Sequence, residues 1–280
     1  MGVIRQYLHD WAVDRLDLDA YCARIGYSAD LSPRLENFHA LHAAHVASVP
    51  FENLDVILGR LVDADLVAVQ DKVVGRGRGG YCYEMNVLFT AALETVGFDV
   101  RRVLARIGDP GEKSAPRTHL VGIVTIDGVQ WLSDVGFGSG LLHPAPLIDG
   151  HEVEQGGWRY RVIRGGDGAW RMQRWSDEGW ATGYTVAEEA TYPADVAVAN
   201  HWTSTYARSI FVRQPVVIRR AVGIERSLVG RTATVLRPDG CKVEQVLDDD
   251  AMREWLADSG LPLTAADVEV LVRWQPTPDE

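Results

Sequence analysis

The chain is organised around residues 76–86, which read Arg-Gly-Arg-Gly-Gly-Tyr-Cys-Tyr-Glu-Met-Asn. The glycines permit a tight turn, and an apolar helical pattern follows at once and stops at Gly97. Cys82 is therefore expected in the first turn of a helix, where unpaired N–H groups and the helix dipole favour a thiolate. Arg76 and Arg78 would add positive charge nearby. These features make Cys82 the candidate nucleophile.

The alternative is that Cys82 is a buried structural residue, as most unpaired cysteines are. Cys22 lies in an ordinary helical pattern and Cys241 follows a turn, so neither has a glycine loop or a helix N-terminus around it. Residues 75–80 also match G-x-G-x-x-G, but a dinucleotide-binding loop needs a strand directly before it. Residues 65–74 look helical or irregular, so we reject a nicotinamide site.

Composition limits the class of protein. The chain has 280 residues, 46% of them hydrophobic and 24% charged, which is typical of a globular protein with two or three domains. The net charge of −11 argues against nonspecific binding of nucleic acid. Three cysteines without close spacing fit a reducing cytoplasm. Residues 1–16 carry charges throughout, so we expect no signal peptide, and no apolar run reaches the roughly 18 residues of a membrane span.

The first hundred residues predict helices. One opens at residues 16–19 and ends near Gly26, and a second begins at the Ser32-Pro33 pair, with serine as the cap. The second helix carries three histidines at a spacing of three, which places them near one another. No carboxylate or cysteine completes a ligand set, so we expect solvated or capping roles instead of metal binding. The three are His39, His42 and His45.

Beyond Gly97 the pattern changes to the period of two that indicates β-strands. Asp127-Gly128 is a strong hairpin signal between strands at 120–126 and 129–134. With a two-residue turn, His119 and Asp134 become diagonal neighbours on one face, with Cβ atoms about 7–8 Å apart at most. Asp134 could then orient His119 toward a third group. A one-residue slip would separate them, and a surface histidine beside a strand-end aspartate is the alternative.

Further strands and one helix are predicted from the same patterns. The antiparallel strands suggest a sandwich or a barrel. A helix is expected at 251–259, closed by Gly260. The remaining strands are expected at 100–107, 158–163, 169–175, 180–186, 216–220, 232–236 and 242–247.

Four motifs in order resemble those of the arylamine N-acetyltransferases. They lie between residues 50 and 138, and weaker similarity extends from Leu16 to about Phe211. The motif that contains the cysteine is specific, and four motifs in order are strong evidence. The motifs are Pro50-Phe51-Glu52-Asn53-Leu54, Arg78-Gly79-Gly80-Tyr81-Cys82-Tyr83-Glu84-Met85-Asn86, Arg117-Thr118-His119 and Asp134-Val135-Gly136-Phe137-Gly138.

The resemblance implies an α+β fold whose core is like that of the cysteine proteases. An N-terminal helical bundle would span residues 1–98 and carry the nucleophile. A central antiparallel β-barrel would span residues 99–200 and carry the histidine and the aspartate. A C-terminal α/β lid would span residues 201–280. A monomer or a homodimer in the cytoplasm is expected.

The resemblance also implies a ping-pong reaction without a metal. Cys82 would take an acetyl group from acetyl-CoA and pass it to an arylamine, an arylhydrazine or an N-hydroxyarylamine. His119 would activate the thiol, and Asp134 would orient His119. The Cys82 N–H is the candidate oxyanion donor.

Further roles follow from the same resemblance. Phe51 and Phe137 would line the acyl and arylamine pocket, and Gly136 and Gly138 would let the pantetheine of CoA approach. Arg78 with Glu52 and Asn53 would brace the cysteine loop.

One segment departs from the family pattern. The family often has Ser-Thr-His-Pro in the lid region, where this chain has residues 204–207, Ser-Thr-Tyr-Ala. The acceptor specificity and the CoA contacts of this segment are therefore left open. Two rival activities are also left open. One is a macrolactam-forming amide synthase that takes its acyl chain from a carrier protein, and the other is a thiol hydrolase that passes the acyl group to water. A non-enzymatic binding module with a structural Cys82 is the third alternative.

Overall fold

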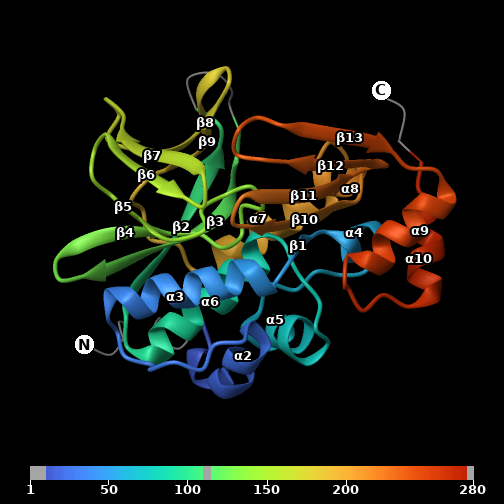
Figure 1. The fold of residues 1–280 in the computed structure, drawn as a ribbon. Coiled ribbons are helices and arrows are strands. Elements are labelled where there is room, and N and C mark those ends of the chain that lie inside the picture. The colour runs from blue at the N-terminus through green and yellow to red at the C-terminus, as the bar shows by residue number, and fades with distance from the viewer. Residues whose placement is uncertain (1–10, 110–114, 276–280) are drawn as a thin grey trace.

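The computed structural model describes residues 11–109 and 115–275. The expectation of no signal peptide concerned residues 1–16, and the first ten of these lie outside the described part. The helices of the N-terminal third gather on one side of the molecule, below two antiparallel sheets in Figure 1, and the last two helices lie beside the C-terminal sheet. This arrangement confirms the predicted α+β fold. Within the described residues, no helix is long and apolar enough to cross a membrane.

The N-terminal third is helical, as predicted. Asp17 caps the first long helix by accepting from the N–H of Ala20 at 2.9 Å, and Gly26 ends it with φ of 68°. The second begins at Leu35, not at Ser32-Pro33, because Arg34 occupies the N-cap position. The elements are η1 (Val13–Arg15), α2 (Leu18–Ile25), α3 (Leu35–Ser48), α4 (Leu54–Ile57), α5 (Leu66–Gln70), the π-turn η2 (Asp71–Gly75) and α6 (Cys82–Val96).

Helix α6 lies at the centre of the helical layer. Every residue from Cys82 to Leu93 is buried, so this helix is surrounded by protein on all sides. It packs against α2, α3 and α5 and against the first strands of the larger sheet. The helical turns of α5 and η2, and no strand, precede the glycine loop, which agrees with the rejection of a dinucleotide site.

The larger sheet has eight antiparallel strands in the order β5-β4-β3-β2-β9-β8-β7-β6. It curls until β5 contacts β7, which nearly closes a barrel, and buried side chains such as Val121 and Tyr160 fill the interior. The strands are β2 (Asp99–Ile107), β3 (Arg117–Ile126), β4 (Val129–Ser133), β5 (Ala145–Pro146), β6 (His151–Gln155), β7 (Trp158–Arg164), β8 (Trp170–Ser176) and β9 (Gly179–Val186).

The hairpin between β3 and β4 has the predicted register. Asp127 and Gly128 take φ of 49° and 77°, as the two central residues of a tight hairpin turn require. Ile126 therefore pairs with Val129, and the ladder continues without a slip to Gly122 and Ser133. Asp134 follows immediately after the last paired residue.

The smaller sheet joins distant parts of the chain, in the order β1-β10-β11-β12-β13. Strand β1 comes from the N-terminal third, and its Phe51 pairs with Ile218 of β10. Helices α9 and α10 pack against one another beside this sheet (Figure 1). The elements are β1 (Phe51–Glu52), α7 (Pro193–Thr205), α8 (Ile210–Arg213), β10 (Val216–Ala221), β11 (Ile224–Val229), β12 (Thr232–Leu236), β13 (Lys242–Val246), α9 (Asp249–Asp258) and α10 (Ala265–Val272).

Among the elements that the sequence patterns did not predict are β6, β11, α7 and α10. Strand β6 contains one apolar residue, Val153, so its sequence lacks the alternation of apolar and polar residues that predicts a strand. Helix α7 buries Val196, Ala199, Asn200 and Thr203, a face too polar to be recognised as amphipathic. The division at residues 98 and 200 stays a prediction, although the buried hydrophobic residues form three clusters.

Candidate active site

Cys82 is the first residue of α6, as predicted. Its side chain is buried, and Sγ lies 3.7 Å from the carbonyl oxygen of Thr118 on β3. Cys82 thus lies in the first turn of α6, at the end of the helix where the backbone N–H groups point outward and the dipole is positive. The remaining two cysteines lie elsewhere, Cys22 buried in α2 and Cys241 exposed before β13.

A buried ion pair holds the loop that precedes Cys82. Arg78 donates to Oε1 of Glu52 through Nε at 3.0 Å and Nη2 at 2.8 Å, and its Nη1 lies 3.3 Å from Asp55. Asn53 has a different role, because it bonds to the backbone of Phe211, Gln214 and Val216 in the C-terminal part of the chain. Arg76 pairs with Asp71. Both arginines are thus neutralised by carboxylates, which corrects the expectation that they add net positive charge at the cysteine.

A second buried ion pair supports the start of α6. Oε2 of Glu84 accepts from the N–H of Tyr81 at 3.0 Å, and Oε1 accepts from Nζ of Lys72 at 2.7 Å. Lys72 also lies 2.9 Å from Asp55. Burial raises the pKa of Glu84 to about 7, although Lys72 opposes the shift. The geometry at Cys82 therefore depends on charges with almost no access to water.

His119 and Asp134 meet as the hairpin register predicts. Nε2 of His119 lies 2.8 Å from Oδ2 of Asp134, and both side chains are almost completely buried. Burial alone would lower the pKa of His119. The Asp134 charge and hydrogen bond, together with the Cys82 thiol, raise it instead to about 10. In turn, the His119 charge holds the pKa of Asp134 below its usual value against the effect of burial.

Asn86 is a site residue whose role the sequence reasoning missed. It lies one helical turn after Cys82 and donates through Nδ2 to Oδ1 of Asp134 at 2.9 Å and to the Leu120 carbonyl at 2.7 Å. Its Oδ1 accepts from the N–H of Val135 at 3.2 Å. The i, i+4 spacing from Cys82 was the available signal. Asn86 thus ties the nucleophile's helix to the aspartate.

His42 also holds Asp134, from the opposite side. The N–H of Asp134 donates to Nε2 of His42 at 3.3 Å, so Nδ1 carries the proton and donates to the Leu142 carbonyl at 3.1 Å. Burial lowers the pKa of His42 to about 3, which keeps the ring neutral. His45 is equally buried and bonds to the Tyr21 hydroxyl. The expectation of solvated or capping roles is therefore wrong for both, because their face of α3 packs against Phe89.

We expect His42→Phe to lower the free energy of unfolding by about 2–4 kcal/mol, because two buried backbone groups lose their partner. Acyl transfer should also fall, since Asp134 would lose a contact that fixes its position. Urea unfolding and steady-state kinetics would measure the two effects. His39→Phe, on the half-buried face of the same helix, is the control and should leave both quantities near wild type. Equal behaviour of the two variants would contradict this role of His42.

Gly136 lies against the backbone of the nucleophile. A Cβ at this position would lie 2.8 Å from Cα of Cys82 and 2.6 Å from Nδ2 of Asn86, so only glycine fits. Gly138 has φ of 80°, and a Cβ there would meet the Ile218 side chain at 2.8 Å. Protein contacts thus account for both glycines, and their predicted role beside pantetheine stays a prediction.

We expect Gly136→Ala to lower acyl transfer at least a hundredfold and to destabilise the fold by about 1–3 kcal/mol. The added methyl group must push the 134–138 segment away from Cys82. Gly166→Ala is a matched control, because a Cβ there meets nothing within 4 Å. Kinetics and thermal unfolding of both variants would measure the difference, and wild-type kinetics in Gly136→Ala would refute the argument.

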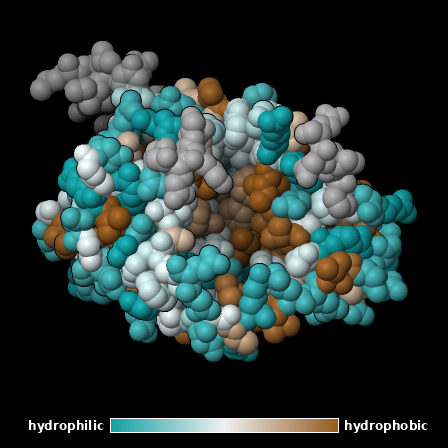
Figure 2. Space-filling model, turned by 90° about the horizontal axis from the view of Figure 1, so that it is seen from above, coloured by the Kyte–Doolittle hydropathy of each residue, from teal (hydrophilic) through white to brown (hydrophobic). Residues whose placement is uncertain are grey.

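A pocket of about 430 Å³ opens beside two of the catalytic candidates, Cys82 and His119. Phe51 and Phe137 both line it, and their role beside the acyl and arylamine groups stays a prediction. Tyr184 was missed; its ring lies 4.8 Å from that of His119 and 5.1 Å from that of Phe137. Seen from above, hydrophobic residues gather in a hollow of the surface (Figure 2). The other lining residues are Cys82, Ile107, Ala115, Pro116, Thr118, His119, Gly136, Trp202, Thr203, Arg208, Ser209, Ile210 and Phe211.

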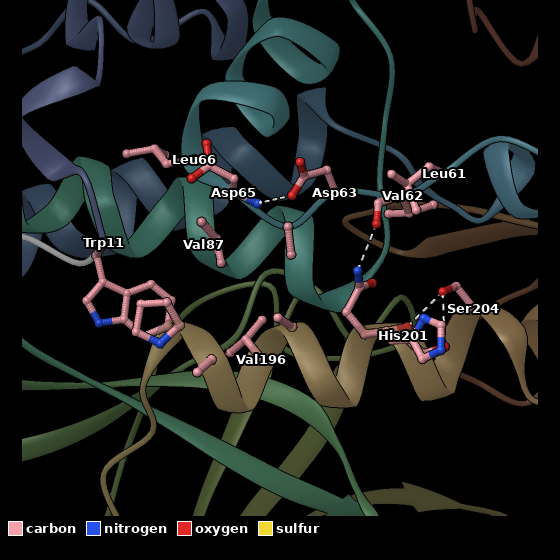
Figure 3. A pocket seen from close by; sticks show the side chains of 15 residues that line it. Trp11, Leu61, Val62, Asp63, Asp65, Leu66, Val87, Val196, His201 and Ser204 are labelled. Carbon is pink, nitrogen blue, oxygen red and sulfur yellow. Dashed lines mark hydrogen bonds between the residues drawn. The ribbon is translucent and has the colours of Figure 1, made fainter.

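A separate pocket of about 490 Å³ lies along another side of α7 (Figure 3). Trp11, Val87 and Val196 form apolar walls, and His201 lies on the opposite side from Trp11. Asn200 in its wall accepts from the Tyr81 hydroxyl and donates to the Val62 carbonyl. Cys82 does not line this pocket, so it is distinct from the candidate active site.

Comparison with known proteins identifies the family. A family model described as N-acetyltransferase matches residues 34–268. The arylamine N-acetyltransferase of Mycolicibacterium smegmatis is 36% identical over 229 residues, which are 79% of this chain and 83% of that protein. The chain belongs to the arylamine N-acetyltransferases. It is therefore an acyltransferase, and its family supports acetyl transfer to arylamines.

Solved arylamine N-acetyltransferases have the same fold. The Nocardia farcinica crystal structure is 37% identical, with a TM-score of 0.89 over 94% of this chain and 96% of that one. The Mycobacterium marinum enzyme in complex with CoA is 30% identical, with a TM-score of 0.82 over 91% and 98%. In residues 11–109 and 115–275 of the present arylamine N-acetyltransferase, no group of three or more His, Cys, Asp or Glu is placed to hold a metal ion.

Proposed function

We propose that the chain transfers acetyl from acetyl-CoA to the nitrogen of an arylamine, arylhydrazine or N-hydroxyarylamine through an acetyl-Cys82 intermediate. The observation that carries this proposal is that Cys82 and His119 line one apolar pocket, while the buried Asp134 holds His119 from behind at 2.8 Å. The CoA complex of the Mycobacterium marinum relative supports acetyl-CoA as the donor substrate. The proposed chemistry uses no metal ion.

The first half-reaction loads the cysteine. The Cys82 thiolate attacks the thioester carbonyl, and the backbone N–H of Cys82 is our candidate donor to the oxyanion. The carbon–sulfur bond to CoA breaks, and CoA leaves as a thiol after it takes the proton from His119. The raised pKa of His119 favours the imidazolium that this step needs at neutral pH.

The second half-reaction releases the product. The amine nitrogen attacks the acetyl-cysteine, and neutral His119 accepts the proton that the nitrogen loses. The carbon–sulfur bond to Cys82 then breaks, and the thiolate is restored beside the imidazolium. Phe51 and Phe137 would line the pocket for the acetyl and aryl groups, and Gly136 and Gly138 would lie beside pantetheine. Asp134 would keep the ring of His119 oriented throughout.

The test follows CoA release from acetyl-CoA, with and without an arylamine or hydrazine, for wild type and Cys82→Ser. The proposal expects turnover that needs the amine and disappears in the variant. Mass spectrometry without amine should find an added acetyl group on Cys82. Continuous CoA release without amine would instead indicate a thiol hydrolase. If no CoA is released from acetyl-CoA while Cys82 still reacts with iodoacetamide, the result would favour an amide synthase. Full activity in Cys82→Ser would mean that the cysteine is structural.

A further inference from the structure

The face of the smaller sheet that α9 covers carries two arginines side by side. Arg219 of β10 pairs directly with Arg226 of β11, so their side chains leave the sheet on the same face. Directly opposite residues have Cβ atoms about 5 Å apart, and like charges in this arrangement destabilise a sheet. The chain as a whole has a net charge of −11, so a general excess of positive residues does not explain this pair.

Neither arginine is neutralised by the protein. In the part of the chain that the structure describes, Arg219 and Arg226 form no ion pair or hydrogen bond through their side chains, and the half-buried Arg219 has a fully buried Nε with no partner. Burial lowers the pKa of Arg219. The neighbouring Arg220 shows the usual arrangement, since it donates to the Gly140 carbonyl and the Tyr160 hydroxyl. A half-buried charge such as that of Arg219 normally has such partners, whereas Arg226 is exposed.

A groove of about 260 Å³ lies in front of the two guanidinium groups. Gly260, just after α9, lies close to Arg219, because a Cβ there would be 3.3 Å from Nη2 of Arg219. The amide of Gln245 and the indole of Trp255 line the groove, and neither has a hydrogen-bond partner within the described residues. The remaining lining residues are Ala233, Thr234, Val235, Val243, Asp258 and Ser259.

The positive potential in this region includes a third arginine. Burial and the charge of Arg219 both lower the pKa of Arg24, whose donors all point to backbone carbonyls. Asp258 is the carboxylate among the lining residues, and it forms no ion pair with either arginine of the groove in the described structure. The site therefore holds uncompensated positive charge beside unused donors.

We propose that Arg219 and Arg226 bind a phosphate group in the groove between the smaller sheet and α9. Two guanidinium groups suit phosphate because each offers parallel N–H donors to its oxygens. The groove is separate from the Cys82 pocket. Ile218, the residue before Arg219, lies on the opposite face of the sheet and meets Phe51 and the Gly138 position. The ligand is either an inorganic phosphate or the phosphate ester of a metabolite whose ring contacts Trp255.

The test measures the thermal midpoint of unfolding of the full chain at low ionic strength, with and without inorganic pyrophosphate. At roughly ten times its Kd, pyrophosphate should raise the midpoint of wild type by about 3–5 °C. Arg226→Gln should lose this shift, and Arg226→Lys should keep most of it. Arg237→Gln removes an exposed arginine that does not line the groove, and its response should equal that of wild type.

The thermal midpoint of unfolding without pyrophosphate gives a second test, in which the variant should be more stable than wild type. Arg226→Gln should raise it by about 1–3 °C, because the substitution removes repulsion between two directly opposite arginines. A lower midpoint would overturn the proposal, since it would mean that Asp258 neutralises the pair in solution. The proposal also fails if pyrophosphate shifts wild type and Arg226→Gln equally.

Phenyl phosphate separates the two sources of the ligand. Tighter binding of phenyl phosphate than of pyrophosphate, weakened by Trp255→Leu, would support the phosphate ester of a ring-containing metabolite. Tighter binding of pyrophosphate would support an inorganic ligand. Cys82 activity serves as a check of folding and is expected to be unchanged in Arg226→Gln.

Discussion

Asp134→Asn is expected to lower acetyl transfer by roughly three to four orders of magnitude. Asparagine keeps the size of the side chain but removes the charge that raises the pKa of His119 to about 10. Burial then dominates, and the His119 pKa should fall below its ordinary value near 6.5. At neutral pH the ring becomes neutral, so it can neither stabilise a thiolate nor give a proton to the departing CoA.

Two measurements separate this effect from misfolding. Proton NMR of the His119 ring should show a titration near pH 10 in wild type and below pH 6.5 in Asp134→Asn. The rate of Cys82 alkylation at neutral pH should fall together with turnover. The control is Asp267→Asn, which replaces another buried carboxylate that does not contact the triad and binds Arg60 instead. This variant should keep normal activity when it is folded. An unchanged His119 titration would contradict the argument.

Lys72→Met is expected to destabilise the protein by about 3–5 kcal/mol near pH 8. Nζ of Lys72 lies 2.7 Å from Glu84 and 2.9 Å from Asp55, and all three side chains are buried. Methionine fills similar space but leaves both carboxylates without their cation. An unpaired buried charge is far more costly than the loss of the attraction itself.

The stability that Lys72→Met loses should be smaller at lower pH. The pKa of Glu84 in the folded state is already raised to about 7, above its unfolded value near 4.3. Removal of Lys72 raises it further, so the folded variant binds more protons than the unfolded one. Stability therefore increases as pH falls from 8 to 6 and is lost as pH rises through the folded pKa.

Urea unfolding at several pH values would measure this dependence, and Glu84→Gln added to Lys72→Met should recover part of the loss. Lys242→Met, which breaks an exposed pair with Glu244, is the control and should have no measurable effect. If Lys72→Met were as stable as this control at pH 8, the buried cluster would not support α6.

Local sequence signals predicted where Cys82, His119 and Asp134 lie because these signals determine local geometry. The Asp127-Gly128 turn and strand alternation were enough to place His119 beside Asp134, 2.8 Å apart in the structure. The glycine loop and the apolar pattern after it were enough to place Cys82 at the start of α6. Each of these inferences needs only residues that are near in sequence.

Contacts between distant segments were not predictable in the same way. A spacing of three indicated that His42 and His45 lie close together, but not that α6 would cover them. The pairing of Lys72 with Glu84 and Asp55 depends on how α4, η2 and α6 meet, which no pattern within one segment records. Helix α7 and strand β11 were missed because tertiary packing, more than periodicity, determines which of their residues are buried.

Strand β1 has a consequence for how the protein is made. Its Phe51 pairs with Ile218 on one side and forms a bridge to Gly80, in the loop before Cys82, on the other. The amide of the nearby Asn53 reaches Phe211, 158 positions later. During synthesis, the segment beside the nucleophile therefore cannot gain its final pairing until β10 has left the ribosome. We expect an inactive nascent chain until late in translation, and a folding rate limited by closure of this long loop.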